Sequence, residues 1–376
     1  MIFNRYYASF VPGMQNVVEA VVRERLSDVR IEKLLDGAIL FASRCTYDKL
    51  NFFCFNNIFA VISVIENPPV NDSSRNTSGT ILEAHMRRAC RSGPHQVIAE
   101  NTKNIRSFRI VCSRENTLAA VDEQVRRDTE RYIAAQSGMA PHRSRPDTEF
   151  WFLCRREGFS VFMKRLTRRG SFEKTLHPGE LPPPLAYLLC RLSGPKPGDV
   201  AADPFCGYGA IPAERLRRFP VSRFYASDRD GGAVEYARKK LAGDAGGRCI
   251  FRQADVYSLP SLLPPESLDA IITDPPWGLY TDIKGPGPAQ RSGGPTARVP
   301  VPPIPIQRFY EDIVEIFAEL LKPGGRAVVL TARRPELADA AARTGKFEIG
   351  DAIPILLSGK KASVFVLRKK PRPIRC

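Results

Sequence analysis

An alternation of apolar, strand-like segments with amphipathic, helical segments, from about Gly198 onward, constrains the fold of this chain most strongly. The segment "QRFYEDIVEIFAELLK" repeats apolar residues at helical spacing, and "GGAVEYARKKLA" reads as a second helix. Such alternation predicts right-handed βαβ units and a parallel sheet covered on both faces. The expected strands are "DVAADPF" (199–205), "RFYASD" (223–228), "CIFRQAD" (249–255), "LDAIITD" (268–274) and "RAVVLTA" (326–332).

Two features break this alternation. The segment "EIGDAIPILLSGKKASVFVLRKK" predicts two strands joined by a turn at Gly359, so we expect the sheet to close with an antiparallel pair. Residues 284–305 are dense in glycine and proline, which excludes regular structure. We expect them to form a disordered insertion or a mobile active-site loop.

The first half of the chain predicts two smaller α+β units. A chain of 376 residues favours two or three domains. The polar segment 67–80, "NPPVNDSSRNTSGT", predicts a loop or boundary between the units. The expected elements are strands in "NRYYASFV", "GAILFAS", "IFAVISVI" and "SFRIVCSRE", helices in "QNVVEAVVRERL" and "LAAVDEQVRRDTERYIAAQ", and a hairpin in "TEFWFLCRREGFSVFMKRL" that turns near Gly158.

The formal net charge of +16 predicts an acidic partner, either nucleic acid or an anionic membrane surface, unless the basic surface is merely solvated. The longest uncharged apolar stretch lies between Lys49 and Glu66, which is shorter than the ~20 residues of a spanning helix. The N-terminus lacks the pattern of a secretory leader, which predicts a cytoplasmic protein.

Nine scattered cysteines without a C-x-x-C pair, and only four histidines, predict neither a disulfide framework nor a metal site.

The motif "DPFCGYG" (203–209) follows the first strand of the alternating region. Gly207 and Gly209 stand before a helix, where they allow a tight turn and close approach of the backbone to a ligand. The third glycine of a dinucleotide fingerprint and the Gly-Lys-Ser/Thr of a P-loop are both missing. A nicotinamide or nucleoside triphosphate site is therefore disfavoured.

Acidic residues follow three consecutive expected strands. With Asp203, they are Asp228, placed to bind ribose hydroxyls, and Asp255, placed to accept from an adenine amine. Helix capping is the alternative for both, and we expect Asp230 to be the N-cap of the next helix. Strand ends of an open α/β sheet converge on one crevice. A ligand with adenine, ribose and a third group, but without a phosphate loop, suggests S-adenosylmethionine.

The fourth expected strand ends in "TDPPW", where Asp274 precedes Pro275, Pro276 and Trp277. An amine attached to a base ring is a poor nucleophile because its lone pair is delocalised into the ring. A carboxylate and a backbone carbonyl that accept its N–H bonds favour the pyramidal form, and two prolines hold such a turn stiff. The indole can stack on the base. The alternative is a turn that only ends the strand.

The motifs "DPFCGYGAIPAE", "YASDRD", "QADVYSLP" and "TDPPWGLY", in this order and spacing, resemble those of the THUMP-domain RNA methyltransferases. The chain is most similar to the members that make N2-methylguanosine in tRNA. The resemblance implies a ferredoxin-like α+β domain (1–70), an RNA-binding THUMP domain (71–172) and a class I, Rossmann-like methyltransferase domain (173–376). It also implies that 173–199 is the link leading into the catalytic sheet.

The resemblance implies S-adenosylmethionine as cofactor and an RNA partner, most simply tRNA. We expect a monomer that needs neither metal nor membrane. The implied catalytic residues are Asp274, Pro275, Pro276 and Trp277. The implied cofactor-binding residues are Asp203, Pro204, Cys206, Gly207, Gly209, Asp228, Asp255 and Asp274. The candidate RNA surface is the basic hairpin with Arg155, Arg156, Lys164, Arg165, Arg168 and Arg169, together with the tail Arg368, Lys369 and Lys370.

Two departures from the family pattern bear on function. Tyr208 stands between the two glycines, where members usually have Ser or Thr, and Trp277 stands where the tRNA guanine enzymes more often have Tyr or Phe. A tryptophan there is familiar from adenine-N6 methyltransferases. Guanine N2 in tRNA is the expected acceptor, adenine N6 of RNA or DNA is the alternative, and a non-catalytic RNA-binding protein with a relic fold is a further alternative.

Overall fold

The computed structural model describes residues 3–66, 75–93, 95–99, 105–115, 117–167, 176–278, 303–350, 352–357 and 359–371. The chain divides into two compact units. The first contains Met1–Phe10 and Glu19–Ser171, and the second contains Val11–Val18 and Phe172–Cys376.

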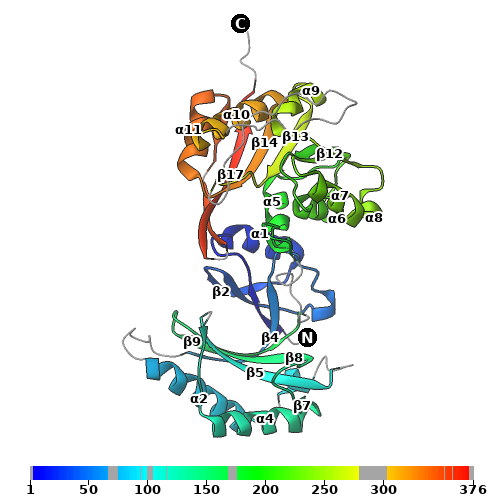
Figure 1. Ribbon diagram of the computed structural model, residues 1–376. Helices are drawn as coiled ribbons and strands as arrows, with labels where there is room; N and C mark the ends of the chain where they lie inside the picture. The colour runs from blue at the N-terminus through cyan, green and yellow to red at the C-terminus, as the bar shows by residue number, and fades with distance from the viewer. Residues whose placement is uncertain are drawn as a thin grey trace. The chain divides into compact units, whose positions relative to one another are not determined.

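The N-terminal half of the chain forms one nine-stranded sheet in the order β2-β3-β1-β4-β9-β8-β5-β6, with β7 paired to β5. Figure 1 shows α2 and α4 along one face of this sheet. The elements are β1 (Asn4–Ser9), α1 (Gln15–Arg25), β2 (Arg30–Leu35), β3 (Ala38–Ser43), η1 (Tyr47–Lys49), β4 (Asn57–Glu66), α2 (Arg75–Arg91), α3 (Gln96–Ala99), β5 (Ser107–Arg114), β6 (Thr117–Leu118), α4 (Glu123–Ser137), β7 (Ala140–Pro141), β8 (Thr148–Arg155) and β9 (Phe159–Arg165).

Strand alternation divides the side chains of this sheet between two cores. Phe150 and Phe152 of β8 pack with Leu82 of α2 and Ile133 of α4. Leu153, the residue after Phe152, belongs to a second cluster on the opposite side, and the intervening Trp151 packs against that cluster, because successive side chains of a strand point to opposite faces. Both faces of β8 are thus apolar, and the strand is buried from both sides.

The predicted hairpin is confirmed, since β8 and β9 pair in antiparallel fashion and Gly158 takes a positive φ of 84° between them. The loop predicted over 67–80 is wrong from Arg75 onward, where α2 begins; residues 67–74 lie outside the described residues. The helix expected from Leu118 begins only at Glu123. Asp122 caps it by accepting a hydrogen bond from the N–H of Val125 at 3.0 Å.

The sheet is continuous across the predicted domain boundary at residue 70. β4 pairs with β1 on one side and with β9 on the other. The order β2-β3-β1-β4, with α1 after β1, is the arrangement within the expected ferredoxin-like segment. The division into domains 1–70, 71–172 and 173–376 stays a prediction.

The basic hairpin is not the exposed surface that we expected. Arg155 is 8% exposed and ion-paired with two glutamates, and Lys164 is 1% exposed with its ammonium donating to a backbone carbonyl. Arg165 lies in an ion pair at 3.0 Å with a buried glutamate. The prediction is therefore wrong for these three cations. Arg156 is exposed, and residues 168–169 lie outside the described residues.

The second unit is an eight-stranded sheet in the order β12-β11-β10-β13-β14-β17-β15, with β16 paired to β17. Helices α6 and α7 lie on one side of it and α10 and α11 on the other (Figure 1). The elements are α5 (Pro183–Leu192), β10 (Val200–Asp203), α6 (Ala210–Arg218), β11 (Arg223–Asp228), α7 (Gly231–Lys240), α8 (Ala242–Ala245), β12 (Cys249–Gln253), η3 (Val256–Ser258), α9 (Leu259–Leu262), β13 (Leu268–Thr273), α10 (Ile306–Leu320), β14 (Leu321–Thr331), α11 (Arg334–Thr344), β15 (Phe347–Ile349), β16 (Ile353–Leu357) and β17 (Lys360–Lys369).

The predicted parallel sheet is confirmed: β10 pairs in parallel with β11 and β13, and β14 continues the sheet from β13. The predicted closure is also confirmed, because β17 is antiparallel to both β14 and β16, with a turn at Gly359.

In the basic tail, Arg368 is exposed, whereas the ammonium of Lys369 donates to the carbonyl of Leu321 at 2.7 Å. Most of the insertion 284–305 lies outside the described residues.

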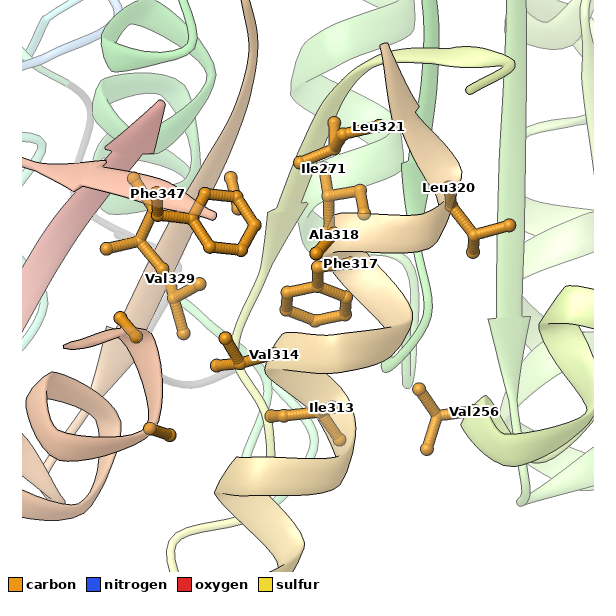
Figure 2. Close-up of a cluster of buried hydrophobic side chains, with 14 of the residues drawn as sticks. Val256, Ile271, Ile313, Val314, Phe317, Ala318, Leu320, Leu321, Val329 and Phe347 are labelled. Atoms are coloured by element: carbon orange, nitrogen blue, oxygen red, sulfur yellow. The ribbon is translucent and has the colours of Figure 1, made fainter. Parts of the chain in front are cut away.

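The core that supports the strand ends is formed by the apolar face of α10. Figure 2 shows Phe317, Ile313 and Val314 of this helix facing Ile271 of β13 and Val329 of β14. Phe317 is fully buried. Among the helices that the structure describes, none has the length and apolar character needed to cross a membrane.

Substituting Phe317→Ala should lower the free energy of unfolding of this unit by roughly 3–5 kcal/mol, because a buried ring is replaced by a cavity. Urea unfolding followed by the fluorescence of Trp277, in a Trp151→Phe background, measures the change. Glu319→Ala on the exposed side of the same helix is the control, expected within about 0.5 kcal/mol of the parent. Equal losses in the two variants would contradict this account of the core.

Candidate active site

A cavity of about 200 Å³ lies at the carboxyl ends of β10, β11 and β13. Five residues predicted from the sequence line it, namely Asp203, Cys206, Gly207, Asp228 and Asp274. The crevice predicted at this edge of the sheet is therefore present. Pro204, Gly209, Asp255, Pro275, Pro276 and Trp277 are not among the described residues that line it.

Asp203 ends β10 with its carboxylate buried, 1% exposed. Its Oδ1 accepts hydrogen bonds from the hydroxyl of Thr273 at 2.8 Å and from the N–H of Phe205 at 3.1 Å. Burial raises the pKa of this carboxyl to about 8, despite these two bonds. The ends of β10 and β13 are thereby joined through one hydrogen bond between two side chains.

The two glycines of the motif have different roles. Gly207 has a φ of +47°, and a Cβ added there would meet nothing within 4 Å, so its backbone faces open space at the cavity. Gly209 is the N-cap of α6 with a φ of +84°, and a Cβ there would lie 2.9 Å from the Cβ of Ala237 in α7. Gly209 thus permits close packing of a helix, whereas Gly207 leaves room for a ligand.

Asp228 ends β11 and contacts the glycine loop directly. Its Oδ2 accepts from the N–H of Gly207 and its Oδ1 from the N–H of Asp230, both at 2.9 Å. Burial raises the pKa of Asp228, and the two N–H donors oppose the rise. The predicted N-cap role of Asp230 is confirmed, because its carboxylate accepts from the N–H of Gly232 at 2.9 Å.

Asp255 follows β12 and caps η3 by accepting from the N–H of Tyr257 at 3.2 Å. Its other oxygen accepts from the guanidinium of Arg229, with the Nε at 2.8 Å. The capping alternative is therefore observed, and the carboxylate is engaged by a cation. Its assignment to an adenine amine stays a prediction.

Asp274 is the first residue after β13 and lines the cavity. Its Oδ1 accepts a hydrogen bond from the indole Nε1–H of Trp277 at 2.9 Å, which fixes the ring beside the carboxylate. Oδ2 has no hydrogen-bonding partner among the described residues. Burial raises the pKa of Asp274 to about 7.

Arg333 holds the backbone of this motif and was missed by the sequence analysis. Its Nε donates to the carbonyl of Trp277 at 2.7 Å and its Nη2 to the carbonyl of Gly278 at 3.3 Å. The N–H of Arg333 bonds to the hydroxyl of Thr331, which also pairs with the hydroxyl of Tyr310 at 2.6 Å. The only signal in the sequence is an arginine after a strand, which is too common to be diagnostic.

A turn at residues 177–181 forms another part of the cavity wall. Pro178, Gly179, Glu180 and Leu181 line the cavity. The sequence analysis assigned this segment only to the link before the catalytic sheet. Tyr208, the bulky residue between the glycines, also lines the cavity, and its ring stacks on that of His177.

The cavity is strongly acidic. Its lining residues include five acids, and none of the described lining residues is a lysine or arginine. Carboxylates that share a poorly solvated space favour a cationic ligand over an anionic one. No group of three or more residues suited to holding a metal ion occurs in the part of the chain that the structure describes.

Residues 171–286 match the family model described as "RMKL-like, methyltransferase domain". This part of the chain is therefore similar to the methyltransferase domain of that family. The match spans the cavity, from the wall turn to the Asp274 motif.

Curated relatives extend the similarity. The chain is 24% identical over 328 residues to the tRNA (guanine(6)-N(2))-methyltransferase THUMP3 of Mus musculus. The aligned region covers 82% of this chain and 60% of the mouse protein. It is 36% identical over 111 residues to the tRNA (guanine(10)-N2)-dimethyltransferase of Methanothermobacter thermautotrophicus, covering 29% of this chain and 31% of that one. The chain therefore spans less than two thirds of these relatives.

The fold extends over nearly the whole chain of a solved structure. TrmN from Thermus thermophilus aligns with 97% of this chain and 99% of its own, with a TM-score of 0.75 and 24% identity. The predicted class I methyltransferase fold, preceded by further α+β structure, is thereby confirmed.

Substituting Arg333→Met should loosen the Asp274–Gly278 backbone, because two carbonyls lose charged donors worth about 1.5–3 kcal/mol each. In a Trp151→Phe background, Trp277 is the only tryptophan, and its emission should shift to the red with greater quenching by acrylamide. Arg334→Met alters the adjacent, exposed arginine and should leave the emission unchanged. An unchanged emission in both variants would show that Arg333 does not position the motif.

Proposed function

We propose that this protein transfers a methyl group from S-adenosylmethionine to an exocyclic amine of a base in structured RNA, with guanine N2 of tRNA as the acceptor. The observation that carries the proposal is Asp274. It joins a rigid aromatic motif to an acidic cavity at the strand ends, and one of its oxygens is available to a substrate.

The residues of the cavity suit this cofactor. S-adenosylmethionine, when bound, supplies a methyl group on a positively charged sulfonium and leaves as a neutral thioether. Asp203, Asp228 and Asp274 place carboxyl groups around the cavity, so a cation is stabilised there. Asp228 would hold the ribose hydroxyls, with its two oxygens fixed by backbone donors. Gly207 leaves room for the ligand at the loop.

Asp274 acts on the acceptor amine. As the carboxylate, it accepts an N–H bond from the amine through Oδ2 and draws the nitrogen toward its pyramidal, nucleophilic form. When the nitrogen forms its bond to the methyl carbon it becomes positively charged, and the carboxylate takes the surplus proton. A base with a pKa near the working pH suits this role. Trp277, held by Asp274 and Arg333, would stack on the base.

The acceptor is proposed from the relatives and from charge. The two relatives described above are named as tRNA guanine-N2 methyltransferases. A net charge of +16 suits a polyanionic substrate, because neutralising phosphates supplies most of the sequence-independent affinity for nucleic acid. A monomeric state and a cytoplasmic location remain predictions from the sequence.

The proposed role of Asp274 predicts how the rate depends on pH. Its carboxyl pKa is raised to about 7, so the ionised form that accepts the amine proton is lost as the pH falls below that value. With both substrates below saturation, kcat/KM should rise with pH and level off above an apparent pKa of about 7. Asp274→Asn should reduce the rate by roughly 100-fold or more and abolish this limb. Full turnover by Asp274→Asn would refute the mechanism.

The reaction is identified by incubating the full chain with labelled S-adenosylmethionine and either unmodified tRNA or DNA, then digesting the nucleic acid. N2-methylguanosine in tRNA is the expected product. N6-methyladenosine alone would replace the guanine assignment by the adenine alternative. Tight RNA binding without any labelled nucleoside would favour a non-catalytic binding protein.

A further inference from the structure

His177, Tyr208 and Tyr236 form an aromatic cluster beside the cavity. The rings of His177 and Tyr208 are stacked, with centroids 4.0 Å apart and planes 9° from parallel. The ring of Tyr236, from α7, meets both at its edge, at 4.6 Å from His177 and 5.6 Å from Tyr208. Residues from three separate segments therefore meet in one contact.

The turn that carries His177 is closed on itself. The N–H of Glu180 donates to the carbonyl of His177 at 2.9 Å, and the N–H of His177 donates to the Glu180 carboxylate at 3.1 Å. The other carboxylate oxygen of Glu180 pairs with the ammonium of Lys240 at 2.6 Å. This reciprocal bonding makes residues 177–181 a small rigid unit, tethered to α7 at Glu180.

The stacked rings join two walls of the cavity. Pro178, Gly179 and Leu181 line it from the turn, whereas Cys206 and Tyr208 line it from the loop after β10. His177 and Tyr236 are not among the described lining residues, so the stack continues outward from the cavity at Tyr208. A ligand that filled the cavity would contact both walls.

We propose that the stacked pair His177–Tyr208 is a latch that holds the 177–181 turn against the 203–209 loop and so sets how tightly, and for how long, the cofactor is held. The identity of the cofactor held by the latch rests on the proposed function, whereas the contact between the turn and the loop does not depend on it. Tyr208 is accordingly a positioning residue. Its ring stacks on that of His177, and so connects the loop to the turn.

The energetic basis is preorganisation. If the wall is ordered before the ligand arrives, binding does not have to supply the conformational entropy of ordering it. An aromatic pair contributes enough to change an equilibrium constant by roughly 2- to 12-fold beyond its buried area. A leucine at either position keeps apolar contact but not the stacking, and phenylalanine at position 208 keeps the ring.

The first experiment tests the latch without any ligand. Hydrogen–deuterium exchange of the full chain follows the backbone amides of residues 176–181 in the parent, Tyr208→Phe and Tyr208→Leu. We expect exchange in Tyr208→Leu to be roughly 2- to 12-fold faster than in the parent, and Tyr208→Phe to match the parent. Equal exchange in all three proteins would overturn the latch.

The second experiment measures coupling to the cofactor. The Kd and dissociation rate of S-adenosylmethionine are measured for the parent, Tyr208→Leu, His177→Leu and the double variant. Each single change should weaken binding by roughly 2- to 12-fold, mainly through faster dissociation. The Kd of the double variant should not exceed that of the single variant with the higher Kd, because either change removes the same contact. If the loss of affinity in the double variant equals the product of the two single losses, the two residues contribute independently and the latch is overturned.

A matched control separates the latch from general loss of packing. Phe219→Leu breaks another aromatic pair of the same unit, with Tyr187 at 5.0 Å, whose residues are not among those lining the cavity. Its Kd should equal that of the parent, and an equal loss there would overturn the assignment to Tyr208. Absence of S-adenosylmethionine binding by the parent would refute the proposed cofactor, and with it the cofactor role of the latch, whereas the exchange experiment would still decide whether the latch exists.

Discussion

The hydrogen bond between the hydroxyl of Thr273 and the buried carboxylate of Asp203 is the contact on which the site depends. It joins the last residue of β13 to the last residue of β10, at 2.8 Å, where the backbone pairing of the two strands has already ended. Beyond Asp203 the chain forms the glycine loop, and beyond Thr273 it forms the Asp274 motif. The distance between the glycine loop and Asp274 is therefore set by one side-chain hydrogen bond, supported by the sheet beneath it.

Burial of the carboxyl groups around the cavity also favours a positively charged ligand over a neutral one. Asp203, Asp228 and Asp274 all have raised pKa values, first because of burial, and the charges of Asp228 and Asp274 raise that of Asp203 further. A cation entering the cavity lowers these pKa values, whereas a neutral ligand of the same shape does not. In the proposed reaction the ligand loses its positive charge at the chemical step. On that proposal, the cavity would hold the positively charged donor more strongly than the neutral product, which would favour exchange of product for donor after each turnover.

Local sequence was sufficient wherever a local pattern decides the structure. The strands ending at Asp203 and Asp228, the cap at Asp230 and the closing hairpin at Gly359 follow from apolar runs and turn residues, and all are observed. Contacts between distant segments could not be read in this way. Arg333 reaches Trp277 across 56 positions of sequence, and Arg155 and Lys164 look like a basic surface until their partners from other segments are known. Helix α2 was missed because its first turn is polar.

Strand β4 has a consequence for how the N-terminal half of the chain can be divided. β4 is hydrogen-bonded to β1 along one edge and to β9 along the other. A fragment that ends after β4 therefore lacks β9, and the edge of β4 that paired with it is left with a row of unsatisfied N–H and C=O groups. Such an exposed edge recruits other strands, and fragments that carry one tend to aggregate. The strands before and after residue 66 therefore form one hydrogen-bonded sheet, and a fragment that is to stay in solution has to contain both β4 and β9.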